Sequence, residues 1–465
     1  MTLLRLRVAT QFGQTVDEAH YYLYGKFLDW SYFDHPPLVG WVQALFQQLP
    51  LSGLLQARIP AMLLSLLTSK LLFDYLLSKN VSERNSLYAV LALNLTPMFN
   101  AMSVALLPDT LLMPLTLLIV DRTEKVLTHS NLKNWLLLGL WLGLAGLSKY
   151  TAALYVFALI IIFTSKRRWR EVLKPDFWAG LGTALLLVLP VLYWNIRNHF
   201  SSFQYQADHV LTLNSGIIKN LSASFAIQLV SWGLGPFIMA LLAFVILMKN
   251  ITRLRSYYSS VITASVFLVF FIYVAVSEVL LPHWMLVFFV LMIPLGYSHF
   301  LERKMFLQGL LISTLISGIL SFLLLFEMAF KIFPPATTAG LYEGVTGWDE
   351  VMKQASETAL HIEKKQLGLA VMNWTLGSRA MYYNDSKLPV FVIDKRHDQF
   401  DIWTPQSPVG FDLLVIIEAA KKDEHLAHLN CAEITSVGEK TTLIKEVPVN
   451  HFLYYHCANF LGYKE

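Results

Sequence analysis

The sequence predicts a mainly α-helical, polytopic membrane protein with a small α/β domain at its C-terminus. Of its 465 residues, 55% are hydrophobic and 15% are charged, and the mean hydropathy is +0.51. Soluble globular domains average roughly a quarter charged residues. This composition excludes one large soluble core, and it gives no indication of a nucleic-acid partner.

The membrane part is predicted from apolar segments within residues 1–333. A helix needs about 20 apolar residues to cross the hydrocarbon of a bilayer, and most of these segments approach that length. We therefore expect about ten spans. The predicted segments are 54–77, 86–105, 109–126, 134–148, 151–164, 177–194, 221–248, 257–277, 283–296 and 305–330.

The basic residues of the loops predict how these helices are oriented. Successive loops alternate sides, and one set carries fifteen lysines and arginines where the other carries four. The positive-inside rule assigns the richer set to the cytoplasm. That set holds Lys79, Arg84, Arg122, Lys125, Lys133, Lys166, Arg167, Arg168, Arg170, Lys174, Lys249, Arg253, Arg255, Arg303 and Lys304. The outer set holds Lys26, Lys149, Arg197 and Lys219.

Residues 334–465 have the composition of a soluble domain. Pro334-Pro335 ends the last apolar segment. The apolar runs 390–393 and 413–417 predict buried strands, and residues 349–363 predict a helix. A small α/β domain on the extracytoplasmic side fits this pattern. Its two cysteines, Cys431 and Cys457, either pair in an oxidising compartment or stay as buried thiols, and the sequence leaves both readings open.

The first 16 residues do not fit the alternation of loops. They are too short to span, and Arg5 and Arg7 interrupt them. They also lack the apolar core and cleavage site of a signal peptide. Because the loop from Asp17 onward falls on the outer side, we expect a preceding membrane helix that is missing from this sequence. The alternative is that this segment lies along the outer surface.

The outer loops collect polar residues of the types that carry chemistry. Carboxylates beside hydrocarbon are costly and usually functional. Paired carboxylates serve as general acids and bases or hold a cation, and a lysine or histidine can hold a phosphate. The set suits a site where a hydroxyl or amine attacks a sugar that leaves from a lipid phosphate. It comprises Asp17, Glu18, Asp34, His35, Asp109, Lys149, Arg197 and His283.

Each of these residues also has a purely structural interpretation. Asp17 and Asp109 each stand at the start of a predicted helix, where a carboxylate can be an N-cap. The residues 34–37 are also typical of a turn, because Pro-Pro stops a helix. Lys149 can extend toward water from the interface, and His283 can anchor the chain there. Their placement on one side is harder to explain by capping and anchoring alone.

Several motifs resemble bacterial proteins of the glycosyltransferase family 39 type. These are related to the dolichyl-phosphate-mannose protein mannosyltransferases and to the lipid A aminoarabinose transferase. The resemblance extends over the whole chain, and the motif of the first outer loop is its most specific part. The matching stretches are 17–22, 32–38, Pro108-Asp109, 146–150, 193–195, 202–204 and 399–403.

This resemblance implies the GT-C fold, which has a transmembrane catalytic core and an outer soluble domain. It implies an inverting transfer of a sugar from a polyprenyl-phosphate donor to a lipid, glycan or protein acceptor. It also implies a multi-pass protein of the bacterial inner membrane, with the active site and C-terminal domain periplasmic. Asp17 occupies the position of the family's usual candidate base, and Asp109 matches a second acidic position.

The remaining candidates are expected to bind the phosphate or to orient the reactants. The aminoarabinose transferase has Glu-Lys-Pro-Pro where this chain has Asp34-His35-Pro36-Pro37, so the acid is retained and histidine replaces lysine. Lys149, with His35 and with Arg197 or His283, would stabilise the leaving phosphate. Glu18 and Asp34 would orient the acceptor, or a divalent metal if the reaction uses one.

Two other classes remain open at this point. One is a lipid-binding or transport protein without chemistry. Transporters usually place ionisable groups or broken helices near the middle of the bilayer. Here Lys70 and Asp74 lie at helical spacing near a cytoplasmic end, where they can pair with each other. The other class is an inactive remnant, which the short N-terminus suggests.

Overall fold

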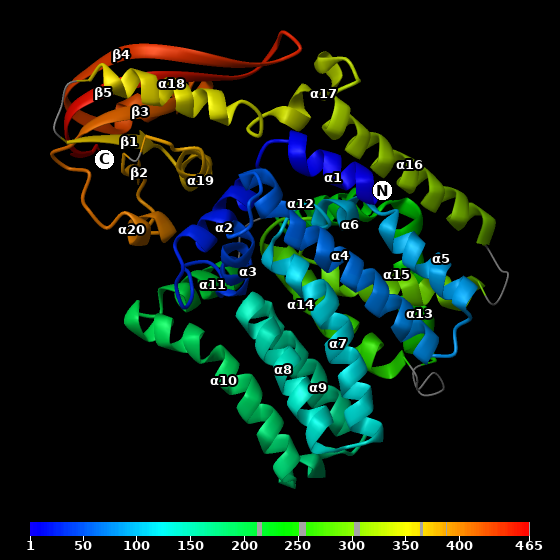
Figure 1. The fold of residues 1–465 in the computed structure, drawn as a ribbon. Coiled ribbons are helices and arrows are strands. Elements are labelled where there is room, and N and C mark those ends of the chain that lie inside the picture. The colour runs from blue at the N-terminus through cyan, green and yellow to red at the C-terminus, as the bar shows by residue number, and fades with distance from the viewer. Residues whose placement is uncertain (212–215, 251–256, 302–306, 363–365, 387, 465) are drawn as a thin grey trace. The chain divides into compact units, whose positions relative to one another are not determined.

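The computed structural model describes residues 1–211, 216–250, 257–301, 307–362, 366–386 and 388–464. The chain divides into two compact units. The first comprises Met1–Leu6, Asp29–Val42 and Gln56–Leu325. The second comprises Arg7–Leu28, Gln43–Leu55 and Phe326–Glu465. Figure 1 labels most of the helices and the strands of these units.

Helices follow the predicted apolar segments of the first unit. Within the described residues, four helices are long and apolar enough to cross a membrane: α4 (Gly53–Ser78), α10 (Pro175–Arg197), α14 (Tyr258–Ser277) and α16 (Leu307–Phe330). The others are α3 (Leu38–Gln47), α5 (Glu83–Asn94), α6 (Pro97–Met102), α7 (Pro108–Thr128), α8 (Leu132–Ser148), α9 (Ala153–Ser165), α11 (Ser201–Leu211), α12 (Ile217–Trp232), α13 (Leu234–Lys249) and α15 (Leu286–Leu301). Before the first predicted segment, α1 (Thr2–Gln11) is a short helix.

Two of the predicted continuous helices are broken. The segment 86–105 breaks between α5 and α6, where the Thr96 side chain caps α6 by accepting from the amide of Phe99. The segment 221–248 bends by 111° between α12 and α13. Gly233 stands at this bend with φ +79°, and a Cβ there would meet Ser317 Oγ at 2.3 Å. Because only glycine fits both the backbone and the space, the bend is built into the sequence.

Glycines bring α8 and α10 into direct backbone contact. A Cβ on Gly139 would meet the Gly180 carbonyl oxygen at 2.0 Å, and a Cβ on Gly180 would meet the Trp135 carbonyl oxygen at 2.5 Å. These helices lie side by side in Figure 1, next to α9. Such close packing at small residues is usual for helices inside membranes, where there is no hydrophobic drive to hold them together.

The charged pair that the sequence places within a predicted helix is present. Lys70 donates to Asp74 at 2.5 Å, as the helical spacing predicts. Arg253, Arg255, Arg303 and Lys304 lie outside the described residues.

The second unit contains a five-stranded sheet. Its strands are β1 (Leu367–Val371), β2 (Val390–Val392), β3 (Asp412–Glu418), β4 (Leu429–Ile444) and β5 (Val447–Tyr463), in the order β2-β1-β3-β5-β4. β1 is parallel to β2 and β3, while β5 is antiparallel to β3 and β4. Both predicted strands, β2 and β3, are therefore confirmed, and β1, β4 and β5 were not predicted.

Helices of the same unit pack on the sheet. α18 (Trp348–Leu360) and α19 (Trp374–Tyr382) contribute to the core on one face, where β3 presents Leu414 and Ile416. The alternate β3 residues Leu413 and Val415 face the other core. Both faces of β3 are thus buried, which is why its sequence is continuously apolar. The remaining helices of the unit are α2 (Val16–Lys26), α17 (Pro335–Tyr342), α20 (Gln399–Trp403) and α21 (Lys422–His428).

The cysteines are paired. Cys431 on β4 and Cys457 on β5 form a disulfide. The sequence left open whether the two cysteines pair or stay as buried thiols, and in the structure they pair.

Candidate functional site

A buried ion pair joins the start of α7 to the end of α8 in the first unit. The Lys149 ammonium donates to both oxygens of the Asp109 carboxylate, at 2.8 and 2.7 Å. The two side chains are 10% and 6% exposed, so Lys149 does not extend toward water. Asp109 is not the N-cap of α7 either, because Leu107 holds that position. Charges this deeply buried are tolerated only when each has a partner of opposite sign.

The local chain geometry fixes this pair. α8 ends at Ser148, and Lys149 follows with an extended backbone before a short turn over residues 150–152. The Ser148 hydroxyl donates to the carbonyl oxygen of Pro108 at 2.7 Å, which ties the end of α8 to the start of α7. Pro108 occupies the first turn of α7, where its fixed φ suits a helix start. The ammonium and the carboxylate are thereby held together although 40 residues separate them in sequence.

Two histidines lie close to the ion pair. His283 Nε2, in the turn between α14 and α15, is 3.7 Å from Asp109 Oδ2, which is too far for a hydrogen bond. Burial lowers the pKa of His283 to about 4, against the attraction of the Asp109 carboxylate. His283 is therefore neutral near pH 7 and offers hydrogen bonds in place of a positive charge. His35 interacts electrostatically with both His283 and Asp109.

Tyr150 extends the polar cluster toward the first outer loop. Its hydroxyl shares a 2.5 Å hydrogen bond with Ser202 Oγ and interacts with Ser31 and with the charge of Asp34. Asp34 is half-buried, and its backbone carbonyl accepts from Gln206 at 2.9 Å. The structure thus brings five sequence-predicted residues into one polar cluster of the first unit: Asp34, His35, Asp109, Lys149 and His283.

Asp29 supports this loop and was not among the predicted residues. Its carboxylate accepts from the Trp194 indole at 2.8 Å, and its carbonyl accepts from the Trp41 indole at 3.0 Å. Its amide donates to the Tyr32 hydroxyl at 3.2 Å. These bonds fix the loop that carries Asp34. The sequence offered one hint, since Asp29 stands just before the loop motif and Trp194 belongs to another matching stretch.

Arg197 is not part of the cluster. It lies exposed at the end of α10, where its guanidinium donates to the hydroxyl of Tyr193, one turn earlier, at 3.4 Å. The guanidinium also lies 5.8 Å from the centre of the Tyr193 ring.

Asp17 and Glu18 belong to the second unit, in the first turn of α2. Thr15 is the N-cap, so Asp17 is not. The Glu18 carboxylate accepts from the amide and the hydroxyl of Thr15 at 3.1 and 3.0 Å, which completes a capping box. Glu18 therefore has a local structural task, while Asp17 is half-buried at the second helical position. The catalytic role of Asp17 stays a prediction.

Within the described part of the chain, no group of three or more histidine, cysteine or acidic side chains is arranged to hold a metal ion. The suggestion that Glu18 or Asp34 orients a divalent metal stays a prediction.

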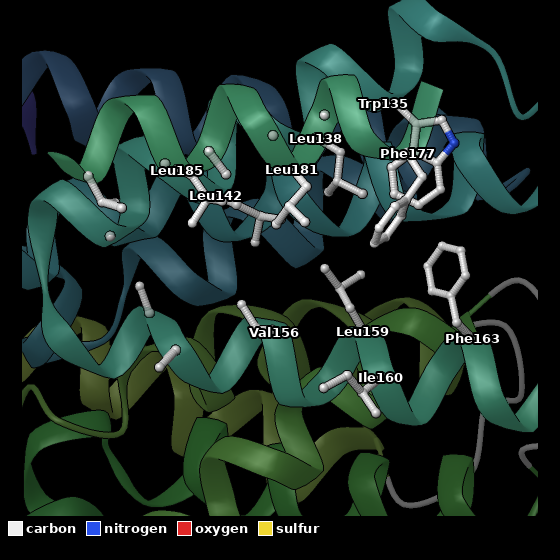
Figure 2. Close-up of a pocket in the computed structure, with 18 of the residues that line it drawn as sticks. Trp135, Leu138, Leu142, Val156, Leu159, Ile160, Phe163, Phe177, Leu181 and Leu185 are labelled. Carbon is white, nitrogen blue, oxygen red and sulfur yellow. The ribbon is translucent and has the colours of Figure 1, made fainter. Parts of the chain in front are cut away.

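An apolar groove leads away from Lys149 and Tyr150. It encloses about 640 Å³ and is lined by α8, α9 and α10. Figure 2 shows side chains of α8 and α10, such as Leu142 and Leu181, facing Val156 of α9 across the space. Nearly all of the lining is aliphatic or aromatic. A long hydrocarbon chain matches such a groove, and Lys149 at its edge matches an anionic head group.

Comparison with known proteins agrees with the resemblance seen in the motifs. Residues 34–194 match the family described as "Dolichyl-phosphate-mannose-protein mannosyltransferase". The lipopolysaccharide core galacturonosyltransferase RgtA of Rhizobium johnstonii is 29% identical over 193 residues. That stretch covers 41% of this chain and 38% of the relative, so the match spans well under half of either protein.

Solved structures match over nearly the whole chain. ArnT from Cupriavidus metallidurans, bound to undecaprenyl phosphate, has a TM-score of 0.66 at 14% identity and covers 97% of this chain and 96% of its own. The apo state of the same protein has a TM-score of 0.63 at 15% identity, with the same coverage. The predicted architecture, a helical membrane core with a small C-terminal sheet domain, is confirmed. The sequence match over residues 34–194 and the shared fold make this multi-pass membrane protein similar to GT-C glycosyltransferases.

Proposed function

We propose that this protein moves a sugar from a polyprenyl-phosphate donor to a hydroxyl or amine of an acceptor, with inversion at the anomeric carbon. The acceptor heteroatom forms a bond to the anomeric carbon while the bond from that carbon to the phosphate oxygen breaks. The electron pair leaves with the polyprenyl phosphate, and the acceptor's proton goes to a carboxylate. The donor phosphodiester gains negative charge as it leaves, so a fixed cation beside it lowers the barrier.

The observation that carries this proposal is the position of Lys149, which borders the apolar groove and also lies in the buried polar cluster. A polyprenyl tail along α8, α9 and α10 would bring its phosphate to the lysine. ArnT, which has the same fold, binds undecaprenyl phosphate, and that supports a lipid phosphate here. The bidentate contact to Asp109 holds the ammonium in place before the donor arrives, so that little reorganisation is needed.

The other candidates take roles that suit their surroundings. His283 and His35 would add hydrogen bonds to the phosphate or the sugar. Asp109, already neutralised by Lys149, is a poor proton acceptor and would instead position the lysine. Asp17 remains the proposed base, on the strength of its position in the first-loop motif. Arg197 would contribute only after a rearrangement of its side chain.

We further propose that the acceptor is a glycan-bearing lipid and that transfer takes place on the periplasmic side of the inner membrane. The similarity to a lipopolysaccharide core galacturonosyltransferase supports the acceptor class. The disulfide between Cys431 and Cys457 supports the periplasmic location, because disulfides persist in oxidising compartments. The bias of basic residues toward the opposite loops supports it as well.

Donor binding offers a direct test. Affinity of the purified protein for undecaprenyl phosphate would be measured for the wild type, Lys149→Gln, Lys149→Arg and a control, Lys219→Gln. Lys219 is a second predicted outer-side lysine and is exposed. We expect Lys149→Gln to bind about 10-fold to 100-fold more weakly, Lys149→Arg to retain part of the affinity, and the control to match the wild type. Equal affinity of Lys149→Gln and the wild type would refute the phosphate role.

A further inference from the structure

The second unit contains a cavity of its own, beside Trp403. It encloses about 480 Å³, within the range of roughly 300–1,000 Å³ that is typical of small-molecule sites. Its lining comes from the end of α2, the turn after α19, and the end of α20 with the residues that follow. Lys26, Phe27, Asn384, Trp403 and Gln406 are among the lining residues. All of these residues belong to the same unit.

An aromatic platform forms part of the wall. The rings of Phe27 and Trp403 stack with centroids 5.2 Å apart and planes 30° apart. Phe27 is 40% exposed, so part of its ring is available to a ligand. Trp403 also contacts Tyr24 and Phe400 edge-on, at 5.9 and 5.3 Å, which fixes the orientation of the indole. A rigid aromatic surface of this kind suits the C–H-rich face of a pyranose ring, which packs on aromatic faces.

Polar groups stand around this platform. Lys26 is exposed in the last turn of α2, with its ammonium 5.7 Å from the centre of the Tyr22 ring and 6.0 Å from that of Tyr382. Asp385 interacts with the same ammonium. The exposed Gln406 contributes an amide that can both donate and accept hydrogen bonds. A ligand here would meet an aromatic face, an amide and a cation at once.

The two cavities therefore suit different molecules. The groove of the first unit is almost wholly aliphatic and aromatic, whereas the cavity beside Trp403 mixes aromatic and polar groups. We infer that the cavity beside Trp403 binds an acidic sugar unit, such as a uronic acid residue, within the glycan of the acceptor. The platform would take the ring face, and Lys26 would take the carboxylate. The link to the acceptor rests on the proposed function; the saccharide site itself rests on the cavity.

Saturation-transfer NMR on the full-length protein in detergent tests this site. The probes are digalacturonic acid and its uncharged counterpart, galactobiose. We expect wild-type protein to bind digalacturonic acid about tenfold more tightly than galactobiose. Phe27→Ala should weaken both probes about tenfold, because it removes the exposed ring of the stacked pair. Lys26→Gln should abolish the preference for the acidic probe, and Lys395→Gln, an exposed lysine elsewhere in this unit, should change nothing.

The outcomes separate this site from the transfer reaction. The double variant Lys149→Gln with Asp109→Asn, which removes the charge of the proposed donor site without leaving a buried charge unpaired, should bind digalacturonic acid like the wild type. Equal binding of the acidic probe by wild type, Phe27→Ala and Lys26→Gln would overturn the saccharide site whatever the fate of the transferase activity. Because Lys26 is exposed, its substitution is expected to leave the fold intact even where Phe27→Ala disturbs packing. In transfer assays of Phe27→Ala and Lys26→Gln, we expect a rise in KM for the acceptor. A rise in KM for the donor lipid instead would overturn the link between this cavity and the acceptor.

Discussion

Neutralising the ion pair of Lys149 and Asp109, one side at a time and then together, separates its structural from its chemical role. At about 2.7 Å and an effective dielectric constant of about 20, two unit charges attract by roughly 6 kcal/mol, and the desolvation of both groups offsets part of this. Breaking a buried pair by removing one partner typically costs about 3–5 kcal/mol, because the other charge stays buried without compensation. Lys149→Gln and Asp109→Asn should each destabilise the protein by that amount.

The double variant, Lys149→Gln with Asp109→Asn, should be less destabilised than either single variant. Glutamine and asparagine can hydrogen-bond to each other, and no charge is left unpaired. We expect it to lie within about 2 kcal/mol of the wild type, which corresponds to a coupling energy of several kcal/mol in the cycle. Unfolding in mixed detergent micelles containing increasing SDS, followed by tryptophan fluorescence, measures each stability.

Transfer activity should follow a different order from stability in the same three variants. If Lys149 stabilises the leaving phosphate, the double variant stays inactive although it is folded. Additive destabilisation, with no recovery in the double variant, would refute the buried pair. Recovery of both stability and activity would show that the pair is structural only.

Three further predictions concern packing, titration and the disulfide. Gly180→Ala should cost about 1–3 kcal/mol and weaken polyprenyl-phosphate binding, since the new methyl meets the Trp135 backbone of α8 and shifts one wall of the groove. Asp398→Asn should stabilise the second unit by about 1–3 kcal/mol at pH 7, because burial raises the pKa of this carboxyl to about 6 and the folded state therefore disfavours its charge. Replacing Cys431 and Cys457 by alanine should lower the stability of the second unit by up to about 3–4 kcal/mol, from the loop that the bond closes.

Each of these has its own check. Gly182→Ala, on the same helix with nothing within 4 Å of the new Cβ, should be neutral or slightly stabilising, and equal effects of the two alanines would contradict the close approach. Wild-type stability should fall as pH rises from about 4 to 6, since Asp398 binds a proton more tightly when folded, and the Asn variant should lose this slope when monitored by thermal unfolding. Free thiols in protein isolated without reductant would contradict the disulfide.

The helical core could be predicted from sequence because length and apolarity alone specify a membrane helix. The bend at Gly233 could not, since it depends on Ser317 from a distant helix as well as on glycine itself. The same holds for the contact between Gly139 and Gly180. Local patterns do not reveal which helices will approach this closely.

The sheet was only partly predictable. β3 is buried on both faces and has a continuous apolar run, which is the pattern that predicts a buried strand. β4 is mostly exposed and mixes polar with apolar residues, so it gave no such run. Its hairpin to β5 turns at Lys445 and Glu446, both with positive φ, and neither is a glycine or asparagine that would have marked the turn.

The residue types of the candidate site were predictable, but their partners were not. Asp109 and Lys149 were each chosen for their side of the membrane, and nothing local indicated that they contact each other. Glu18 is predicted to orient the acceptor or a metal, yet the Thr15–Glu18 spacing of a capping box is also readable in the sequence. The role of Asp29 could not be predicted because nothing local indicates its contacts with the indoles of Trp41 and Trp194, which lie 12 and 165 residues away in sequence.

Transfer of a radiolabelled sugar from its polyprenyl-phosphate carrier into isolated membranes decides whether this protein is the glycosyltransferase proposed here. Membranes containing the wild-type chain should incorporate label into a glycan-bearing lipid. Asp17→Asn and Lys149→Gln, present at matched levels, should reduce incorporation by about 100-fold or more, as expected when a catalytic base or a group that stabilises the leaving charge is lost. Label incorporation by both variants at the wild-type rate would contradict the assigned site. If the wild-type protein incorporates no label from any polyprenyl-phosphate sugar, the proposed function is contradicted.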